Sequence, residues 1–87
     1  MSISAIAARL INALEAAADR EAGAKTALVS VNIDMLTPAD AGTVTTQLTR
    51  KTRTLVFLSA EFRSDAGAII ATAASVHKVA SADSSAY

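Results

Sequence analysis

The sequence has 87 residues, a length that suits one small domain. Apolar residues make up 52% of it and charged residues 18%, which excludes an intrinsically disordered chain. Eight basic and eight acidic side chains give a net charge of zero, so no overall field attracts the protein to nucleic acid or to an anionic membrane. We therefore expect neither as a partner.

The supports that small domains commonly use are scarce in this sequence. There is no cysteine and only one histidine, so we expect no disulfide, no metal site and no cofactor, and self-association is the remaining support. The N-terminus lacks the basic region of a secretory signal, which together with the absence of cysteine predicts a cytoplasmic protein. Arg9 and Glu15 interrupt the longest apolar stretch before it reaches the roughly 18 residues that span a bilayer.

A long helix is predicted from Ser2 to about Ala22. Strong helix formers fill this segment, and apolar side chains recur along one face at Ile3, Ile6, Leu10, Leu14 and Ala17. Ser2 or Ser4 can cap the start, and Gly23 suits the left-handed residue that follows the end. We expect protein to surround this helix, because its polar strip is confined to Arg9, Asn12, Glu15 and Asp19.

Four strands are predicted after the helix. A period of two indicates the first, over 26–35, with one buried face made of Ala27, Val29, Val31, Ile33 and Met35. A loop at 37–42 leads to the second, 43–50, whose threonines and basic flanks are typical of a sheet edge. The third and fourth, 54–64 and 68–79, are joined by the turn Asp65-Ala66-Gly67 and should pair antiparallel.

The predicted fold class is α+β, with one long N-terminal helix packed on a four-stranded antiparallel sheet. Three of the strands should form a meander. Residues 1–79 would form a single domain, followed by a flexible tail over 80–87. Apolar groups lie on more than one face of the strands, which indicates either subunit contacts or a change of phase at β-bulges. These apolar residues are Leu28, Leu55, Phe57, Ile70 and Val76.

Three segments of the chain follow one another in a recognisable order. The first is Val31-Asn32-Ile33-Asp34-Met35-Leu36-Thr37-Pro38-Ala39-Asp40-Ala41-Gly42, and the second is the basic turn Arg50-Lys51-Thr52-Arg53. The third is Phe62-Arg63-Ser64-Asp65-Ala66-Gly67-Ala68-Ile69-Ile70-Ala71-Thr72-Ala73. Their order and spacing resemble those of the hotdog-fold acyl-CoA thioesterases of the phenylacetate-degradation type, over roughly residues 3 to 79.

The resemblance implies a hotdog-like fold, in which a curved antiparallel sheet wraps a long central helix. It also implies that two protomers join their sheets through the strand that follows the helix, with acyl-CoA sites at the interface of a dimer or tetramer. Members of that family have a further strand and a His-Gly-Gly loop before the helix, whereas this sequence begins almost at the helix. If Leu10 matches the helical leucine of the family, the catalytic acidic position falls on Asn12.

Thioester hydrolysis needs a carboxylate to activate water and a donor for the developing oxyanion. The amide of Asn12 can orient water but cannot act as the base, while Glu15 lies one helical turn later and could supply the carboxylate. Asp34 is a further carboxylate that a dimer could bring into a shared cleft. Arg50, Lys51 and Arg53 could hold the phosphates of coenzyme A. Solvated surface charges are the alternative interpretation of each.

Our leading hypothesis is therefore an acyl-CoA thioesterase that acts on an acyl or aryl thioester at a homo-oligomer interface. A non-catalytic oligomer that binds acyl-CoA, or nothing, is the second hypothesis. A third is a module whose strand 43–50 accepts a strand from another chain. A serine-histidine-aspartate site around His77 is disfavoured, because no Gly-x-Ser-x-Gly elbow is present.

Overall fold

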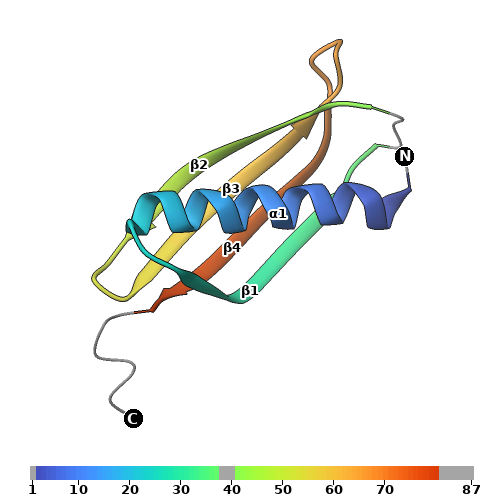
Figure 1. The fold of residues 1–87 in the computed structure, drawn as a ribbon. Helices are drawn as coiled ribbons and strands as arrows, with labels where there is room; N and C mark the ends of the chain where they lie inside the picture. The colour runs from blue at the N-terminus through green and yellow to red at the C-terminus, as the bar shows by residue number, and fades with distance from the viewer. Residues whose placement is uncertain (1, 38–40, 81–87) are drawn as a thin grey trace.

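One helix crosses one face of a four-stranded antiparallel sheet in a computed structural model of the chain, as Figure 1 shows. The structure describes residues 2–37 and 41–80. The α+β prediction is confirmed. The elements are α1 (Ile3–Ala22), β1 (Thr26–Met35), β2 (Thr43–Lys51), β3 (Leu55–Arg63) and β4 (Ile69–Val79).

Both ends of α1 lie where the sequence predicts them. The Ser2 side chain accepts a hydrogen bond of 3.1 Å from the Ala5 N–H, and Gly23 adopts the left-handed conformation with φ at 66°. The buried residues Ile6, Leu10, Leu14 and Ala17 form the predicted stripe, and Ala18 joins them. Ile3 was wrongly placed in it, because contact with the sheet begins one turn later and leaves Ile3 67% exposed.

The order of strands in the sheet is β1-β4-β3-β2. The meander β2-β3-β4, the antiparallel pairing of β3 with β4 and the edge position of β2 all agree with the predictions. β1 forms the other edge, next to β4. β4, which comes last among the described strands, therefore lies inside the sheet and is paired on both sides.

A β-bulge in β1 corrects one prediction. Leu28 pairs with His77 and Ser30 pairs with Val76, so Val29 is an extra residue with no partner, and it is 60% exposed. The buried face that was predicted as one continuous alternation therefore changes phase. Beyond the bulge Val31, Ile33 and Met35 pack against the core as predicted, but before it the inward residue is Leu28 instead of Ala27 or Val29.

The core lies between α1 and the inner face of the sheet. The buried side chains that β3 and β4 contribute to it are Val56, Leu58, Ala60, Phe62, Ile70, Ala71 and Ala73. Ile70 is the extra residue of a second bulge, since Phe62 pairs with Ala71 and Arg63 pairs with Ile69. Two of the five apolar residues expected on both faces, Leu28 and Ile70, are thus explained by bulges.

The face of the sheet that does not contact α1 is called the open face below. Leu55, Phe57 and Val76 are half-buried on it, because they alternate along their strands with buried residues of the helix side. Phe57 and Val76 are directly paired across β3 and β4. These three residues are apolar groups on a second face, as the sequence predicted, although subunit contacts themselves stay a prediction.

Gly42, just before β2, lies against the largest buried side chain of the core. A Cβ atom at this position would be 2.5 Å from Cε1 of Phe62 and would also collide with the carbonyl oxygen of Arg63. Only glycine allows the backbone to approach the ring so closely. The Arg9 guanidinium also contacts this side chain, because it lies over the Phe62 ring, 5.0 Å from the ring centroid.

Two connections and one terminus remain. The β3–β4 turn is closed by a 2.9 Å hydrogen bond from the Gly67 N–H to the Ser64 carbonyl. The predicted loop at 37–42 lies partly outside the described residues. Of the predicted tail at 80–87 only Ala80 is described, and its N–H donates a hydrogen bond to the Lys25 carbonyl. Among the described residues no helix is long and apolar enough to cross a membrane.

Candidate functional site

Asn12 and Glu15 lie together on the side of α1 that faces away from the sheet. Both side chains are exposed, whereas Leu10 and Leu14, which flank them in sequence, are fully buried. Residues three apart on a helix are neighbours on its surface. The amide and the carboxylate therefore share one polar surface, and the described part of the chain leaves it uncovered on that side.

The three cations of the basic turn point in different directions. A bulge at Thr49 shifts the register of β2, so that Arg50 pairs with Phe57 on the open face and Lys51 pairs with Val56 on the helix side. Arg53 is exposed in the turn between β2 and β3. One chain therefore does not gather these residues into a single cluster.

Lys51 already has a hydrogen-bond partner. Its Nζ donates to the carbonyl oxygen of Glu21, 2.5 Å away, in the last turn of α1. Carbonyl groups at the end of a helix have no partner within the helix and carry partial negative charge, so an ammonium group is stabilising there. Lys51 thus fastens the edge strand β2 to the end of the helix.

Asp19 fastens the same end of α1 to the opposite edge of the sheet. One of its carboxylate oxygens accepts hydrogen bonds from the hydroxyl of Thr26, at 2.6 Å, and from the Thr26 N–H, at 2.8 Å. These two bonds, the hydroxyl first, lower the pKa of Asp19. Asp19 therefore binds the start of β1 to the end of α1, although the helical pattern had indicated a free surface charge.

A buried pair of polar side chains lies beneath the helix on β4. Ser75 Oγ and His77 Nε2 share a 2.7 Å hydrogen bond, and both residues are almost inaccessible to solvent. Within residues 2–37 and 41–80, Nδ1 of His77 finds no hydrogen-bond partner. A serine-histidine site of the hydrolase type needs an accessible hydroxyl and a carboxylate on that nitrogen, so this pair does not form one.

The charge state of His77 links the stability of the fold to pH. Burial lowers the pKa of His77, although Glu15 and Asp19 on α1 oppose this effect. The unfolded chain then binds a proton at a higher pH than the folded chain does, so acid favours unfolding. We expect the free energy of unfolding to fall as pH is lowered from 7.5 through 6.5 to 5.

Urea unfolding at several pH values would measure this dependence. In His77→Gln, which keeps a hydrogen-bonding group opposite Ser75, the slope between pH 7.5 and 5 should be absent. Asp19 does not interfere in this range, because its lowered pKa lies at more acidic values. A parent protein with constant stability over the range would show that His77 is not the titrating group.

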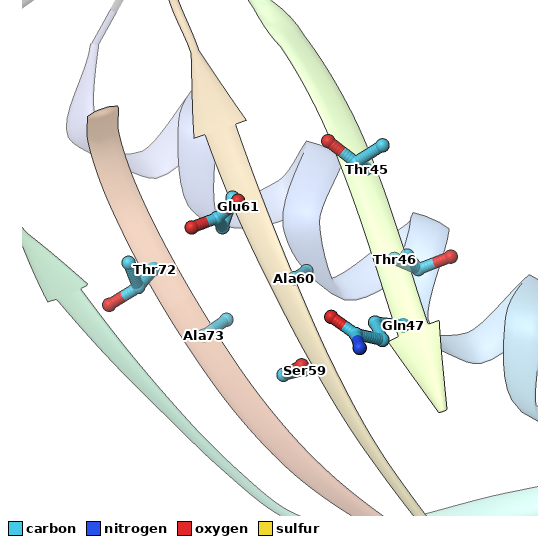
Figure 2. Close-up of a pocket in the computed structure, with 8 residues that line it drawn as sticks. All are labelled: Thr45, Thr46, Gln47, Ser59, Ala60, Glu61, Thr72 and Ala73. Atoms are coloured by element: carbon cyan, nitrogen blue, oxygen red, sulfur yellow. The ribbon is translucent and has the colours of Figure 1, made fainter. Parts of the chain in front are cut away.

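The open face of the sheet contains a polar groove of about 470 Å³. Figure 2 shows its lining on β2, β3 and β4, with the helix behind the strands. Thr45, Gln47, Ser59, Glu61 and Thr72 line it, and Asp34 of β1 pairs with Thr72 beside it. This groove could not be predicted from the sequence, because its residues come together only through the register of the paired strands. The spacing of polar residues two apart in β2 (Thr45, Gln47) and in β3 (Ser59, Glu61) is the signal that the sequence offers.

Comparisons with solved structures identify this arrangement. A Bacillus halodurans protein, whose crystal structure was determined with CoA, superimposes with a TM-score of 0.78 over 92% of this chain at 19% identity. A phenylacetic acid degradation-related protein from Ralstonia eutropha, described as a candidate thioesterase, gives 0.58 over 66% at 30% identity. Zebra fish thioesterase superfamily member 2 gives 0.62 over 69% at 28% identity. The chain is a hotdog-fold relative of the thioesterases.

The hotdog protein spans only about half the length of these solved structures, covering 56%, 44% and 46% of them. Comparison with protein-family models gave no match, and comparison with curated proteins gave no significant one. The predicted fold and its family resemblance are thus confirmed at the level of structure. The roles of Asn12, Glu15, Arg50, Lys51 and Arg53 stay predictions.

Proposed function

We propose that this hotdog protein binds an acyl or aryl thioester of coenzyme A between two copies of the chain and hydrolyses it. The observation that carries the proposal is the exposed pair Asn12 and Glu15 on the central helix of a fold shared with proteins named as thioesterases. The CoA present in the Bacillus halodurans structure supports the choice of ligand. Cytoplasmic location stays a prediction.

In the proposed reaction Glu15 is the general base and Asn12 is the hydrogen-bond donor. The Glu15 carboxylate takes a proton from water while the water oxygen bonds to the thioester carbonyl carbon. The Asn12 amide N–H donates to the carbonyl oxygen as negative charge develops on it. The carbon–sulfur bond then breaks, and the leaving thiolate takes the proton from Glu15. The products are a carboxylic acid and free coenzyme A.

A second copy of the chain would complete the site along the free edge of β1. Among the described residues β1 has a strand neighbour on one side only. Unpaired backbone groups on an edge strand favour pairing with another strand. Antiparallel pairing of two β1 strands would join the two sheets, which is the arrangement that the family resemblance implies. Arg50, Lys51 and Arg53 remain the candidates for binding phosphate, from either copy.

A non-catalytic oligomer is the second candidate. The divergence of Arg50 and Lys51 onto opposite faces and the engagement of Lys51 with the end of α1 favour it. For one nucleotide to meet all three cations, Lys51 must leave the Glu21 carbonyl or a second copy must contribute. Strand acceptance by the edge strand β2 is the remaining alternative, which co-purification with a partner chain would support.

The test is a thioesterase assay on the purified protein with a panel of acyl- and aryl-CoA substrates, run beside light scattering on the same sample. Turnover by an oligomer would support the proposal. A folded oligomer that binds CoA thioesters without turnover would support the non-catalytic candidate. A protein that neither binds nor hydrolyses these compounds would exclude coenzyme A thioesters as ligands.

A further inference from the structure

The outer surface of α1 has a regular arrangement around Asn12. The helical neighbours three and four positions away from Asn12 are Ala8, Arg9, Glu15 and Ala16, and all four are exposed. The two at four positions are alanines, so no large side chain rises beside the Asn12 amide in the direction that runs nearly along the helix axis. The two at three positions carry opposite charges. Asn12 therefore lies between a carboxylate on one side and a guanidinium on the other.

The core beneath Arg9 positions its guanidinium. The group lies 5.0 Å from the centroid of the Phe62 ring, and this ring is fully buried, so it offers the cation a fixed surface. Stacking engages one face of the planar guanidinium and leaves the N–H donors at its edge available. Within residues 2–37 and 41–80 the ion pair is that of Arg63 with Glu61, so no described carboxylate neutralises Arg9. Arg9 is thus a positioned, exposed cation beside Asn12.

The basic residues proposed for the nucleotide lie at the other end of the helix. Lys51 bonds to the Glu21 carbonyl in the last turn of α1, and Arg53 lies in the turn that follows β2. Figure 1 shows this turn beside the C-terminal end of α1. A thioester whose phosphates reach that end and whose carbonyl group reaches Asn12 directs its acyl group toward the N-terminal half of α1. Arg9 lies there, about 4.5 Å along the axis from Asn12.

We propose that Arg9 selects thioesters whose acyl group ends in a carboxylate, such as the monothioesters of short dicarboxylic acids. This inference rests on the proposed function, because it concerns the acyl end of the same site. A guanidinium can donate two parallel hydrogen bonds to a carboxylate, which fixes both the charge and the orientation of the acyl group. Glu15 lies on the far side of Asn12, so its negative charge does not face the anionic end of the ligand.

A pair of matched substrates tests the proposal. Glutaryl-CoA ends in a carboxylate, whereas hexanoyl-CoA has an acyl group of similar length without a charge. We expect the parent to favour glutaryl-CoA in kcat/KM, or in the association constant from calorimetry if the thioesters are bound without turnover. Arg9→Gln should lower this value for glutaryl-CoA by about tenfold or more and change it for hexanoyl-CoA by less than about threefold. The ratio of the two values does not depend on how much of a variant is folded.

Two further variants separate the role of Arg9 from a general effect of charge. Arg9→Lys keeps the charge but loses the paired donors, so it should retain only part of the preference. Arg20→Gln removes the same group from an exposed position nearer the end of α1, and it should leave the ratio of the two thioesters unchanged.

The outcomes distinguish this proposal from the proposed function. A parent that hydrolyses or binds the two thioesters equally well, or an Arg9→Gln variant with the parental preference, would overturn the role of Arg9 and leave the thioesterase proposal standing. Binding that prefers glutaryl-CoA without any turnover would support the role of Arg9 and contradict hydrolysis. A parent that neither binds nor hydrolyses any CoA thioester would overturn both.

Discussion

Replacing Phe62 with alanine is expected to lower the free energy of unfolding by about 3–5 kcal/mol. Phe62 lies on the inner strand β3 and is fully buried, and its ring packs between α1 and the segment at Gly42. Small domains are stable by only about 5–15 kcal/mol, so this loss would remove a large part of the total. Urea unfolding monitored by circular dichroism would measure it.

Phe57→Ala is the matched control for this substitution. It removes the same ring from the same strand, but on the open face, where Phe57 is only half-buried. At protein concentrations low enough to prevent association, its cost should be clearly smaller. Equal losses in the two variants would mean that the helix side of the sheet is not the main apolar core.

Gly42→Ala extends the same test to the backbone. In the parent chain we expect a cost of about 1–3 kcal/mol, because the added Cβ overlaps the Phe62 ring. In the Phe62→Ala background the overlap with the ring is gone, although the Arg63 carbonyl still opposes the methyl group. The double-mutant cycle should therefore show coupling between the two sites. Strictly additive losses would contradict the close approach of Gly42 to the ring.

Glu15→Gln is expected to lower kcat by about 10² to 10⁴-fold if the proposed thioesterase reaction takes place, because the amide cannot accept the proton of the attacking water. The substitution preserves size, and the side chain is exposed, so folding and oligomer mass should not change. Steady-state kinetics with the best CoA thioester of the panel would measure the effect. Glu21→Gln makes the same change in the last turns of α1 and should retain parental turnover.

Asn12→Asp sharpens this test. It introduces a carboxylate at the helical position to which the family resemblance assigns the acidic residue. In the Glu15→Gln background it should restore part of the lost activity, because the two residues share one surface of α1. Full activity in Glu15→Gln alone would show that another group activates the water. Asp34 would then be the next carboxylate to replace.

The helix was predictable because its signals are local. A stripe with spacings of three and four, a serine before it and a glycine after it act within a few residues of one another. The structure agrees with all three, and only Ile3 departs from the stripe. The turn at Gly67 was predictable for the same reason.

The faces of the strands were less predictable, because a bulge changes their phase without a local signal. Val29 and Ile70 look like ordinary members of their strands in the sequence, yet each is an extra residue in its ladder. The position of β1 beside β4 could not be read from periodicity either. Since the polar groove depends on the combined register of several strands, it was not found at all.

The site residues divide in the same way. The shared surface of Asn12 and Glu15 follows from helical spacing alone, and the structure agrees with it. The basic turn was expected to act as one cluster, but the bulge at Thr49 turns Arg50 and Lys51 to opposite sides. The bond from Lys51 to the Glu21 carbonyl joins residues thirty positions apart, which no local pattern encodes.

The central position of β4 determines the order in which this chain can fold. Short turns join the three strands of the meander to one another. β1 pairs only with β4, for example Thr26 with Val79, so its backbone hydrogen bonds to the sheet cannot form until β4 is present. Closing such a long loop is slow, and until then the apolar side chains of α1 and β1 have no complete sheet to cover. During synthesis on the ribosome, the helix and β1 therefore depend on a strand that emerges after β1, β2 and β3.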